Sequence, residues 1–587
     1  MTQNVSRIII CTGTSGISAG AEEVARIFED ELKKRNLTNK WHIVKAGDRG
    51  LFRDVLIDVI DSQGSRFTYE YIKPSDAINI VEEHIIKGKP LKKLLAGKDY
   101  SQFFKGQKRI VLSNCGEISP DNIDEYICTG GYASLKKALN TEPSKVIEEI
   151  EKSGLRGRGG AGFPTGLKWR LCREAESDIK YIICNADEGD PGAFMDRSML
   201  EGAPHSVLEG MAIAGHAIGA NEAYIYCRAE YPQAIKRLTG AIYAARQRGF
   251  IGKNILQTGW SFDVNIVKGA GAFVCGEETA LISSIEGKRG MPKIRPPYPA
   301  QKGLWDKPTL INNVETFANI RHIIEKGSEW FSSIGTLKSK GTKVFALAGK
   351  VKNTGLIEVP MGTTIHDIIY GLGGGQIKRK VPIKAVQMGG PSGGCLPASL
   401  FDTPVDYEAI TQKGAIVGSG GMIVMDAKTC MVDIAKFFLE FTSSESCGKC
   451  LPCRIGLKRM SEVLNEITEG RGRLEHIDFL KDMGNTIKKA SLCGLGNTAP
   501  NPVLSTLEYF ADEYYSHIKE KKCPAGVCTK LLKFKVIPNQ CVKCGKCYKS
   551  CLYGAIEWKK DKHARINKDK CTKCKACFEA CDYMAIS

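Results

Sequence analysis

The chain has 587 residues, 43% hydrophobic and 25% charged, a composition that indicates several globular domains and excludes a largely disordered protein. The sequence contains no run of about 18 apolar residues and no basic segment followed by an apolar run at its start. We therefore expect a cytoplasmic protein without a membrane span or a secretory signal. The net charge of +18 would suit nucleic-acid binding, but the basic residues form no single patch interleaved with aromatic residues, so we expect no nucleic acid.

Residues 1–100 predict a small α/β domain. An apolar run at 8–10 predicts a strand, residues 21–35 have the apolar spacing of a helix, and residues 42–44 predict a second short strand. The following residues, 101–335, alternate helical and strand patterns with dense glycine, which predicts a larger α/β domain.

A glycine-rich loop at 156–169 contains a formal G-x-G-x-x-G, formed by Gly157, Gly159 and Gly162. A Rossmann turn needs a strand directly before such a loop, whereas residues 144–152 have a helical pattern. We therefore expect a non-Rossmann loop whose backbone N–H groups can approach a flat ligand or a phosphate.

Three further motifs in this domain carry polar residues. An apolar strand at 181–184 ends in a turn with two Asp, one Asn and one Glu, and burying such carboxylates is costly unless they bind something. The other two motifs are the Gly-Glu-Glu of 276–278 and the Asn-Asn-Val-Glu-Thr of 312–316. Taken singly, each motif is more typical of a surface turn or a helix cap than of a binding site.

Residues 336–425 are richer in Val, Ile, Gly and Pro and predict a small, mainly β module, whereas residues 426–515 have a helical pattern. The helical segment contains Cys447, Cys450 and Cys453 in C-x-x-C-x-x-C spacing, with Cys493 as a candidate fourth ligand. Three close cysteines and a distant one are typical of an iron–sulfur cluster, and on their own they would also suit zinc.

A short linker at 516–535 carries His517, Cys523 and Cys528. Nitrogen and thiolate ligands suit tetrahedral zinc, but a structural zinc site needs four ligands and the spacing identifies no fourth. A zinc site and two ordinary buried thiols beside a surface histidine are equally compatible with this pattern.

The tail at 536–587 contains an internal repeat. Four cysteines in C-x-x-C-x-x-C-x-x-x-C spacing recur 30 residues later, with no histidine inside either run, which favours two [4Fe–4S] clusters over two zinc sites. In a two-cluster ferredoxin the fourth cysteine of each run binds the other cluster. The predicted ligand sets are therefore Cys541, Cys544, Cys547 and Cys581 for the first cluster, and Cys571, Cys574, Cys577 and Cys551 for the second.

Taken together and in this order, the motifs of residues 114–511 resemble the NADH-binding flavoprotein subunit of respiratory complex I. With the N-terminal domain and the ferredoxin-like tail, the chain is similar to the flavoprotein subunit of electron-bifurcating hydrogenases and transhydrogenases. The resemblance implies a multidomain α/β protein with a thioredoxin-like N-terminal domain and a non-Rossmann FMN and NADH domain. A ubiquitin-like β-grasp module, a helical iron–sulfur domain and a two-cluster ferredoxin tail would follow.

The resemblance also implies which residues bind cofactors. FMN would be held by Gly157, Arg158, Gly159, Gly160, Gly162, Lys168, Asn185, Asp187, Gly276, Glu277, Asn312, Asn313 and Thr316. NAD(H) would stack over the flavin against Phe163 and Tyr298, with Glu188, Asp190 and Glu278 around it. Relatives carry Glu where Asp190 stands. A carboxylate at Glu278 would repel the 2′-phosphate of NADP, and no side chain would act as a catalytic nucleophile, acid or base.

The N-terminal domain departs from its relatives, which hold a [2Fe–2S] cluster there with four cysteines. Residues 1–100 contain only Cys11, and one thiolate cannot hold the cluster. We expect the cluster to be lost and the domain to be retained for contacts with other subunits.

The implied function is that of an NAD(H) oxidoreductase subunit in an electron-bifurcating complex. Its partners would be NAD(H), ferredoxin, a small thioredoxin-like [2Fe–2S] subunit, and a third redox subunit that is either a diiron hydrogenase or an NADPH-binding flavoprotein. Exposed lysines of the tail would steer an acidic ferredoxin toward it: Lys543, Lys546, Lys549, Lys559 and Lys560. The alternatives are a non-bifurcating NADH dehydrogenase or NAD-dependent formate dehydrogenase subunit, a zinc-ribbon protein, and an electron-transfer subunit that has lost its flavin.

Overall fold

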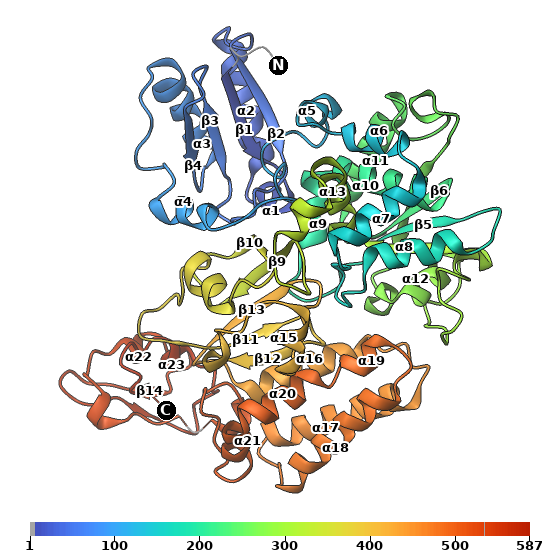
Figure 1. Cartoon of the computed structure of the whole chain (residues 1–587). Helices are drawn as coiled ribbons and strands as arrows, with labels where there is room; N and C mark the ends of the chain where they lie inside the picture. Colours follow the sequence, from blue (N-terminus) through green and yellow to red (C-terminus); the bar gives the residue numbers. More distant parts are fainter. Residues whose placement is uncertain (1–5, 533, 587) are drawn as a thin grey trace.

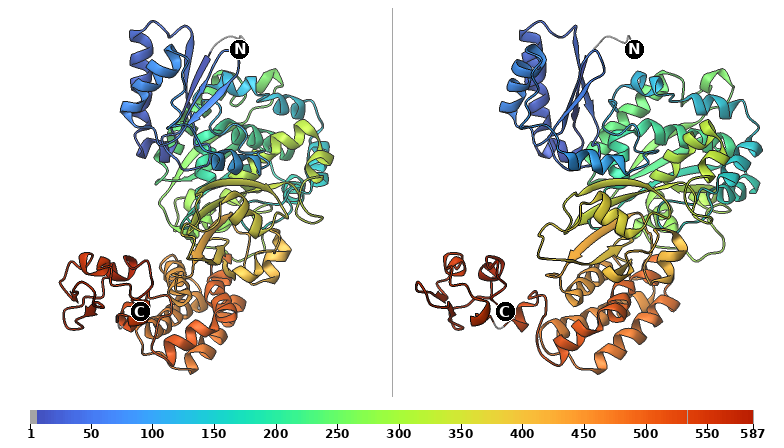
Figure 2. Two further views of the ribbon diagram at one scale, coloured as in Figure 1. Left: turned by 90° about the vertical axis from the view of Figure 1, so that its left-hand side faces the viewer. Right: turned by 60° about the vertical axis from the view of Figure 1, so that its left-hand side comes forward.

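The structure is a computed structural model that describes residues 6–532 and 534–586. Figures 1 and 2 show an elongated arrangement in chain order. The N-terminal domain lies beside the large α/β domain, and the β module lies between that domain and a bundle of helices. The cysteine-rich tail projects from the side of this bundle (Figure 2).

The N-terminal domain is a mixed four-stranded sheet in the order β2-β1-β3-β4, with helices packed on it. Its elements are β1 (Ser6–Cys11), α1 (Thr14–Ser18), α2 (Ala21–Lys34), β2 (Trp41–Ala46), β3 (Ile57–Ile60), β4 (Arg66–Tyr69), α3 (Pro74–Asn79), a π-helix (Ile80–Ile86) and α4 (Lys98–Lys105). The predicted helix and both strands are confirmed. Helix α2 buries Val24, Phe28 and Leu32, which lie on one face at helical spacing.

The large α/β domain contains a fully parallel sheet in the order β7-β6-β5-β8. Its strands are β5 (Tyr181–Ala186), β6 (Glu222–Arg228), β7 (Asp263–Gly269) and β8 (Thr309–Asn313). Its helices are α5 (Ile123–Cys128), α6 (Ala133–Leu139), α7 (Pro143–Ser153), α8 (Thr165–Glu174), α9 (Met195–Gly202), α10 (Pro204–Ile218), α11 (Pro232–Gln247), α12 (Glu278–Ile285), α13 (Val314–Lys326) and α14 (Ser328–Ser332). All four strands end at one edge, where ligands bind in open parallel sheets, and the polar motifs follow β5, β7 and β8 there.

The β module is a five-stranded sheet in the order β10-β9-β13-β11-β12, in which β13 runs parallel to β9 and the other pairs are antiparallel. Its elements are β9 (Thr342–Gly349), β10 (Gly355–Pro360), a π-helix (Asp367–Leu372), β11 (Ile383–Met388), β12 (Gly394–Pro397), α15 (Tyr407–Gln412) and β13 (Gly421–Asp426). The prediction of a mainly β module is confirmed.

The helical segment is confirmed as well, and the tail carries little regular structure. The helices are α16 (Met431–Ser444), a π-helix (Pro452–Gly456), α17 (Leu457–Thr468), α18 (Glu475–Ala490), α19 (Gly494–Thr498), α20 (Asn501–Tyr509) and α21 (Ala511–Ile518). The tail contains α22 (Lys546–Lys549), β14 (Ile556–Glu557), β15 (Arg565–Ile566) and α23 (Ala576–Glu579). No helix of the described residues has the length and apolar character needed to cross a membrane.

Candidate active site and metal centres

The glycine-rich loop joins α7 to α8, so a helix precedes it as predicted. It approaches the end of β8 closely, since a Cβ on Gly159 would lie 3.0 Å from the Cβ of Asn313. Gly160 and Gly162 have φ angles of +125° and +63°, a region that favours glycine. The Arg158 N–H donates to Thr316 Oγ1 at 2.9 Å, which fastens the loop to α13. The sequence therefore needs glycine here both for backbone conformation and for close approach.

The Arg158 side chain contacts the β module, and the contact of this residue with FMN stays a prediction. It is fully buried, and its guanidinium donates to the carbonyl oxygens of Thr342 at 3.0 Å and Lys340 at 2.5 Å. These carbonyls belong to the start of the β module. The side chain thus stabilises the loop by joining it to the β module, and these two carbonyl oxygens occupy its guanidinium.

The acidic turn after β5 contains a carboxylate that lacks a partner. Asp187 is 8% exposed, and neither of its carboxylate oxygens has a hydrogen-bond partner among the described residues. Burial raises the pKa of this carboxyl to about 7. The neighbouring Asn185 orients the turn, because its Nδ2 donates to the Gly276 carbonyl at 2.9 Å. A buried acceptor without a donor is costly, so this position fits a ligand that brings hydroxyl or ring N–H donors.

Several other predicted binding residues cap helices. The Glu188 carboxylate accepts from the Asp196 and Arg197 N–H groups at 3.1 Å each, at the start of α9. Glu277 accepts from the Ala280 N–H at 2.9 Å and caps α12, and Asn313 accepts from the Glu315 N–H at 2.9 Å and caps α13. These side chains are occupied by backbone groups. Glu188 thus caps helix α9 in this structure, and its NAD(H) contact stays a prediction.

Most of the remaining predicted residues are connected to one another by side-chain contacts. Lys168 forms an ion pair with Glu278, and its Nζ lies 5.9 Å from the centre of the Phe163 ring. Arg295 lies 3.9 Å from the Glu278 carboxylate and 6.0 Å from the centre of the Tyr298 ring. Phe163 and Tyr298 are 43% and 53% exposed. Two accessible aromatic rings thus lie beside a row of ion-paired side chains. Asn312 lies deeper and accepts from Trp169 Nε1 at 3.1 Å.

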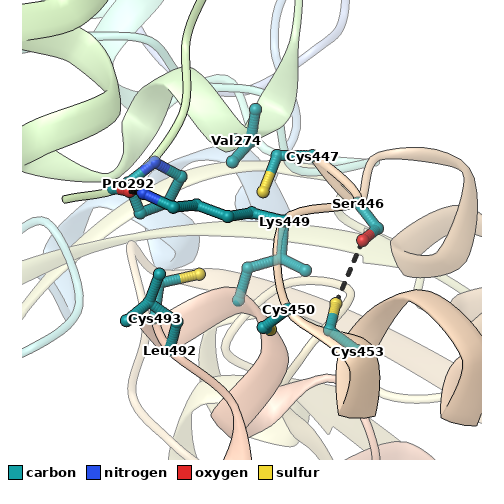
Figure 3. Close-up of a pocket in the computed structure, with 10 residues that line it drawn as sticks. Val274, Pro292, Ser446, Cys447, Lys449, Cys450, Cys453, Leu492 and Cys493 are labelled. Atoms are coloured by element: carbon teal, nitrogen blue, oxygen red, sulfur yellow. Dashed lines mark hydrogen bonds between the residues drawn. The ribbon is translucent and has the colours of Figure 1, made fainter. Parts of the chain in front are cut away.

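Four thiols surround a pocket at the start of the helical segment (Figure 3). The pocket is lined by Cys447, Cys450, Cys453 and Cys493. It also touches Val274, which belongs to the segment that leads to Gly276, and the Phe273 N–H donates to Glu445 at 2.9 Å. The segment 273–276 therefore contacts both the thiol pocket and the acidic turn after β5.

The two predicted ligand sets of the tail are also brought together. One pocket of about 360 Å³ is lined by Cys541, Cys544, Cys547 and Cys581, and another of about 310 Å³ by Cys571, Cys574, Cys577 and Cys551. The fourth cysteine of each run thus crosses to the other run, as predicted from the repeat.

The spacing of the thiols distinguishes clusters from zinc. Ligand sulfurs of a single zinc lie about 2.3 Å from the ion, so they lie within roughly 4.6 Å of one another. In the part of the chain that the structure describes, one group of three or more metal-ligating side chains lies within 4.8 Å, and it is in none of these three pockets. The wider spacing and the four thiols that each pocket offers as ligands fit [4Fe–4S] clusters.

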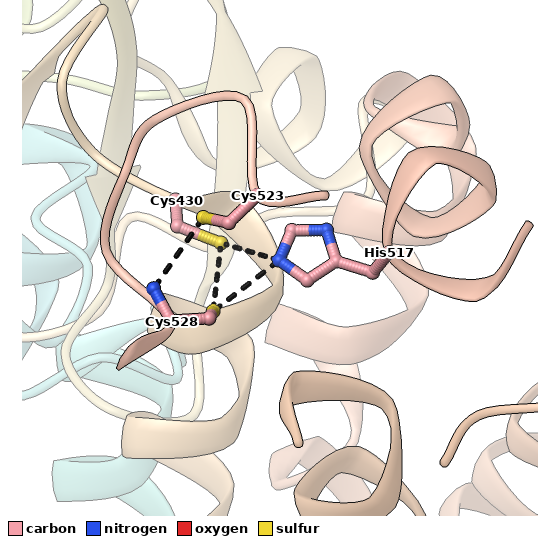
Figure 4. A group of neighbouring side chains, drawn as sticks. All are labelled: Cys430, His517, Cys523 and Cys528. Carbon is pink, nitrogen blue, oxygen red and sulfur yellow. Dashed lines mark hydrogen bonds between the residues drawn. The ribbon is translucent and has the colours of Figure 1, made fainter. Parts of the chain in front are cut away.

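That compact group is formed by Cys430, His517, Cys523 and Cys528, all buried (Figure 4). His517 Nε2 lies 3.4 Å from the Cys430 sulfur and 3.2 Å from the Cys528 sulfur. Nδ1 of the same ring hydrogen-bonds the Glu513 carbonyl at 2.7 Å, which leaves Nε2 free to bind a metal. Cys430 is the fourth member of this group, and the sequence did not identify it.

The loop that follows β1 in the N-terminal domain packs against α9 and α11. The Thr14 N–H and hydroxyl donate to the Glu201 carboxylate at 2.7 and 2.6 Å. Arg237 donates to the carbonyl and hydroxyl of Thr12 at 3.0 and 2.9 Å. Cys11 is buried, and burial raises the pKa of its thiol to about 12.

Comparison with known families agrees with this geometry. The Nuo51 FMN-binding domain matches residues 150–322, and the NADH-ubiquinone oxidoreductase-F iron–sulfur binding region matches residues 433–517. An SLBB domain matches residues 344–396, and a 4Fe-4S dicluster domain matches residues 540–585.

Individual relatives cover most of the chain. The NADP-reducing hydrogenase subunit HndC of Solidesulfovibrio fructosivorans is 55% identical over 78% of this chain and 94% of its own length. A subunit of the NADH-quinone oxidoreductase of Aquifex aeolicus is 44% identical over 68% of this chain and 92% of its own length. A crystal structure of an NAD+-reducing [NiFe]-hydrogenase aligns with 88% of this chain and 84% of the other chain, with 28% identity and a TM-score of 0.61. The chain therefore belongs to the family of NADH-binding flavoprotein subunits, which are NAD(H)-dependent oxidoreductase components with flavin and iron–sulfur regions.

Proposed function

We propose that the chain is the FMN- and NAD(H)-binding subunit of a cytoplasmic electron-bifurcating complex that couples NAD(H) and ferredoxin to a third redox couple. The observation that carries this proposal is that the segment 273–276 contacts both the acidic turn with the unpartnered Asp187 and the pocket lined by four thiols. A two-electron site directly beside a one-electron carrier is what such a coupling requires.

Bound FMN would supply the exchange between hydride transfer and single-electron transfer. The residues of this chain would bind and orient it. The glycine loop lets the backbone approach, Asp187 accepts hydrogen bonds from the ligand, and Phe163 and Tyr298 offer aromatic faces for the nicotinamide and adenine rings. Lys168 and Glu278 form an ion pair in the same proposed site, and the Glu278 carboxylate favours NAD over NADP.

The three thiol pockets would hold three [4Fe–4S] clusters, with the two of the tail serving exchange with ferredoxin. Cys544 and Cys574 are exposed, so both tail clusters are accessible from outside. Lysines contribute charge near the first of them. Lys546 pairs with Asp582 at 2.6 Å, and this hydrogen bond and the Lys546 charge lower the pKa of Asp582. The charges of Lys378 and Lys380 in the β module add to this effect. This basic surface would attract an acidic ferredoxin.

We assign further partners by the same reasoning. A diiron hydrogenase or an NADPH-binding flavoprotein would supply the third couple, and a small thioredoxin-like [2Fe–2S] subunit would carry electrons between the chains. The N-terminal domain, which we assign to the thioredoxin-like fold without a cluster, would provide contacts with these subunits. The β module would have the β-grasp fold.

The test is ferredoxin reduction by the purified native complex, followed by absorbance under strictly anaerobic conditions. The third substrate as electron donor (H2 or NADPH) together with NAD+ should support ferredoxin reduction. That donor without NAD+, or NADH alone, should not, because each electron passed to ferredoxin must be coupled to one passed to NAD+ at higher potential. Equal rates with NADH alone would contradict bifurcation and favour the alternative, a plain NADH dehydrogenase or formate dehydrogenase subunit.

We also propose that the compact group of Cys430, His517, Cys523 and Cys528 holds a structural zinc ion. We expect Cys430→Ser to reduce the zinc content from about one ion per chain to a small fraction of that, with iron unchanged, because a tetrahedral site loses most of its affinity with one ligand. Metal analysis of the purified chain checks this. Cys128→Ser, at an exposed thiol, is the control and should keep its zinc. Unchanged zinc in the Cys430 variant would contradict the assignment.

A further inference from the structure

The β module contacts two loops of the proposed cofactor site, the glycine-rich loop and the acidic turn after β5. Gly418, just before β13, forms a backbone bridge with Gly160 of the glycine-rich loop. A Cβ on Gly160 would lie 3.4 Å from the carbonyl carbon of Gly418, so the two backbones are in direct contact. The loop is therefore held between α13 on one side and the β module on the other.

Tyr407, the first residue of α15, is the main side chain in this contact. It is 7% exposed, and its hydroxyl donates to the Gly157 carbonyl at 2.8 Å. Its ring occupies the space beside Gly162, where a Cβ would lie only 2.8 Å from ring carbons. The ring thus replaces the side chain that Gly162 lacks, and the hydroxyl fixes the other end of the same loop.

Arg156 and Glu408 hold Tyr407 in place. The Arg156 guanidinium lies 4.3 Å from the centre of the Tyr407 ring and pairs with Glu408 at 2.7 Å. Nε of the same arginine donates to the Gly162 carbonyl at 2.6 Å. A ring stacked under a guanidinium and hydrogen-bonded at its hydroxyl has little rotational freedom. Tyr407 is therefore a rigid support for the loop.

Ser419 makes the second contact, to the acidic turn after β5. Its hydroxyl donates to Asp190 Oδ2 at 2.6 Å, and its carbonyl accepts from Lys343 Nζ at 2.5 Å. Gly390 of the β module packs so tightly on the Asp190 carboxylate that a Cβ would not fit between them. The β module thus fixes the position of Asp190 within the proposed cofactor site.

We propose that Tyr407 and Ser419 are positioning residues for the flavin and NAD(H) site, Tyr407 acting through the glycine-rich loop and Ser419 through Asp190. The proposal rests on the proposed function and extends it to the β module, of which residues 344–396 match an SLBB domain. The β module is then one wall of the active site.

The two residues should affect different properties. Tyr407→Phe leaves the Gly157 carbonyl without its donor, so the loop must be ordered when FMN binds. An ordering cost equal to one neutral hydrogen bond corresponds to about tenfold weaker binding of FMN. Ser419→Ala should act on NADH, because Asp190 then loses its partner. Burial raises the pKa of Asp190 to about 6, the Ser419 hydrogen bond lowers it, the charge of Glu188 raises it and that of Arg228 lowers it. Without Ser419, the carboxylate should become protonated at a higher pH.

The experiment uses the full chain. FMN is removed and titrated back while flavin fluorescence is followed. Separately, kcat/KM for NADH oxidation is measured against pH. We expect about tenfold weaker FMN binding for Tyr407→Phe, and for Ser419→Ala an acid limb moved by up to about one pH unit to higher pH. Ser419→Thr keeps the hydroxyl and should restore the profile. Tyr370→Phe, in the π-helix of the same module, is the matched control and should behave as wild type.

Two outcomes would overturn the proposal. If the wild-type chain binds FMN and both variants match it and Tyr370→Phe, the β module does not position the site and the proposed function is unaffected. If the wild-type chain binds no FMN, both the positioning role and the proposed function fail. Thermal unfolding of each variant, followed by circular dichroism, shows whether a change in binding reflects the site or a general loss of structure.

Discussion

Replacing Lys343 with Met should destabilise the chain more than any other single change at the boundary of the β module. Lys343 on β9 and Glu315 on α13 form an ion pair in which both side chains are almost completely buried. Removing one partner of a buried pair leaves an uncompensated charge, and this typically lowers the free energy of unfolding by about 3–5 kcal/mol. We expect the thermal midpoint of the holoprotein, measured by calorimetry, to fall by on the order of 10 °C.

A double variant separates the charge from the contacts of the side chain. Glu315→Gln in the Lys343→Met background removes the second charge and should restore much of the lost midpoint, since its amide oxygen can still accept from the Val344 N–H. Lys352→Met, at an exposed position of the same module, should leave the midpoint nearly unchanged. A Lys343→Met midpoint equal to that of Lys352→Met would show that the pair contributes nothing, contrary to our reasoning.

Local patterns predicted much of the secondary structure and the cluster ligands, because both depend on spacing along the chain. The apolar positions of α2 recur on one helix face, and the cysteine repeat specifies which thiols lie close together, including the crossing of Cys551 and Cys581. The helix before the glycine-rich loop excluded a Rossmann turn. In each case a few neighbouring residues carry the information, and tertiary contacts do not override it.

Long-range contacts could not be predicted in this way. Cys430 lies 87 positions before His517, and nothing in its surroundings marks it as a ligand, because it is a single cysteine at the start of a helix. Ser419 and Tyr407 lie more than 200 positions from the residues they contact, Asp190 and Gly157. These contacts depend on how the β module docks, and no local pattern encodes that docking.

Some residues of the polar motifs also cap helices, and their cofactor contacts stay predictions. An acidic residue or an asparagine directly before a helix is a common N-cap, and Glu277 and Asn313 are used in this way, while Glu188 reaches the N-terminus of α9 from the preceding loop. Glu277 and Asn313 each immediately precede a helical pattern, so the sequence already indicated that both could cap a helix. Asp187 differs from all three, since its carboxylate has no protein donor among the described residues.

The second large effect is therefore expected at Asp187. Asp187→Ala should weaken FMN binding by about 100-fold, because two hydrogen bonds to a charged acceptor contribute roughly 1.5 kcal/mol each and tenfold in affinity corresponds to about 1.4 kcal/mol. Titration of the flavin-free chain with FMN, followed by fluorescence, measures this. Asp178→Ala, at an exposed carboxylate paired with Lys307, is the matched control and should bind FMN as wild type does.

The pH dependence of the same titration tests the mechanism. Burial raises the pKa of Asp187 to about 7 in the absence of a ligand. Donors from a bound flavin favour the ionised carboxylate and lower that pKa. Protons and flavin then compete, so FMN affinity should be highest above about pH 7 and should fall as the pH decreases below it. In Asp187→Ala this dependence should disappear along with the affinity. If the variant kept the wild-type affinity and pH dependence, the unpartnered carboxylate would not be the flavin acceptor, and the acidic turn after β5 would need another explanation.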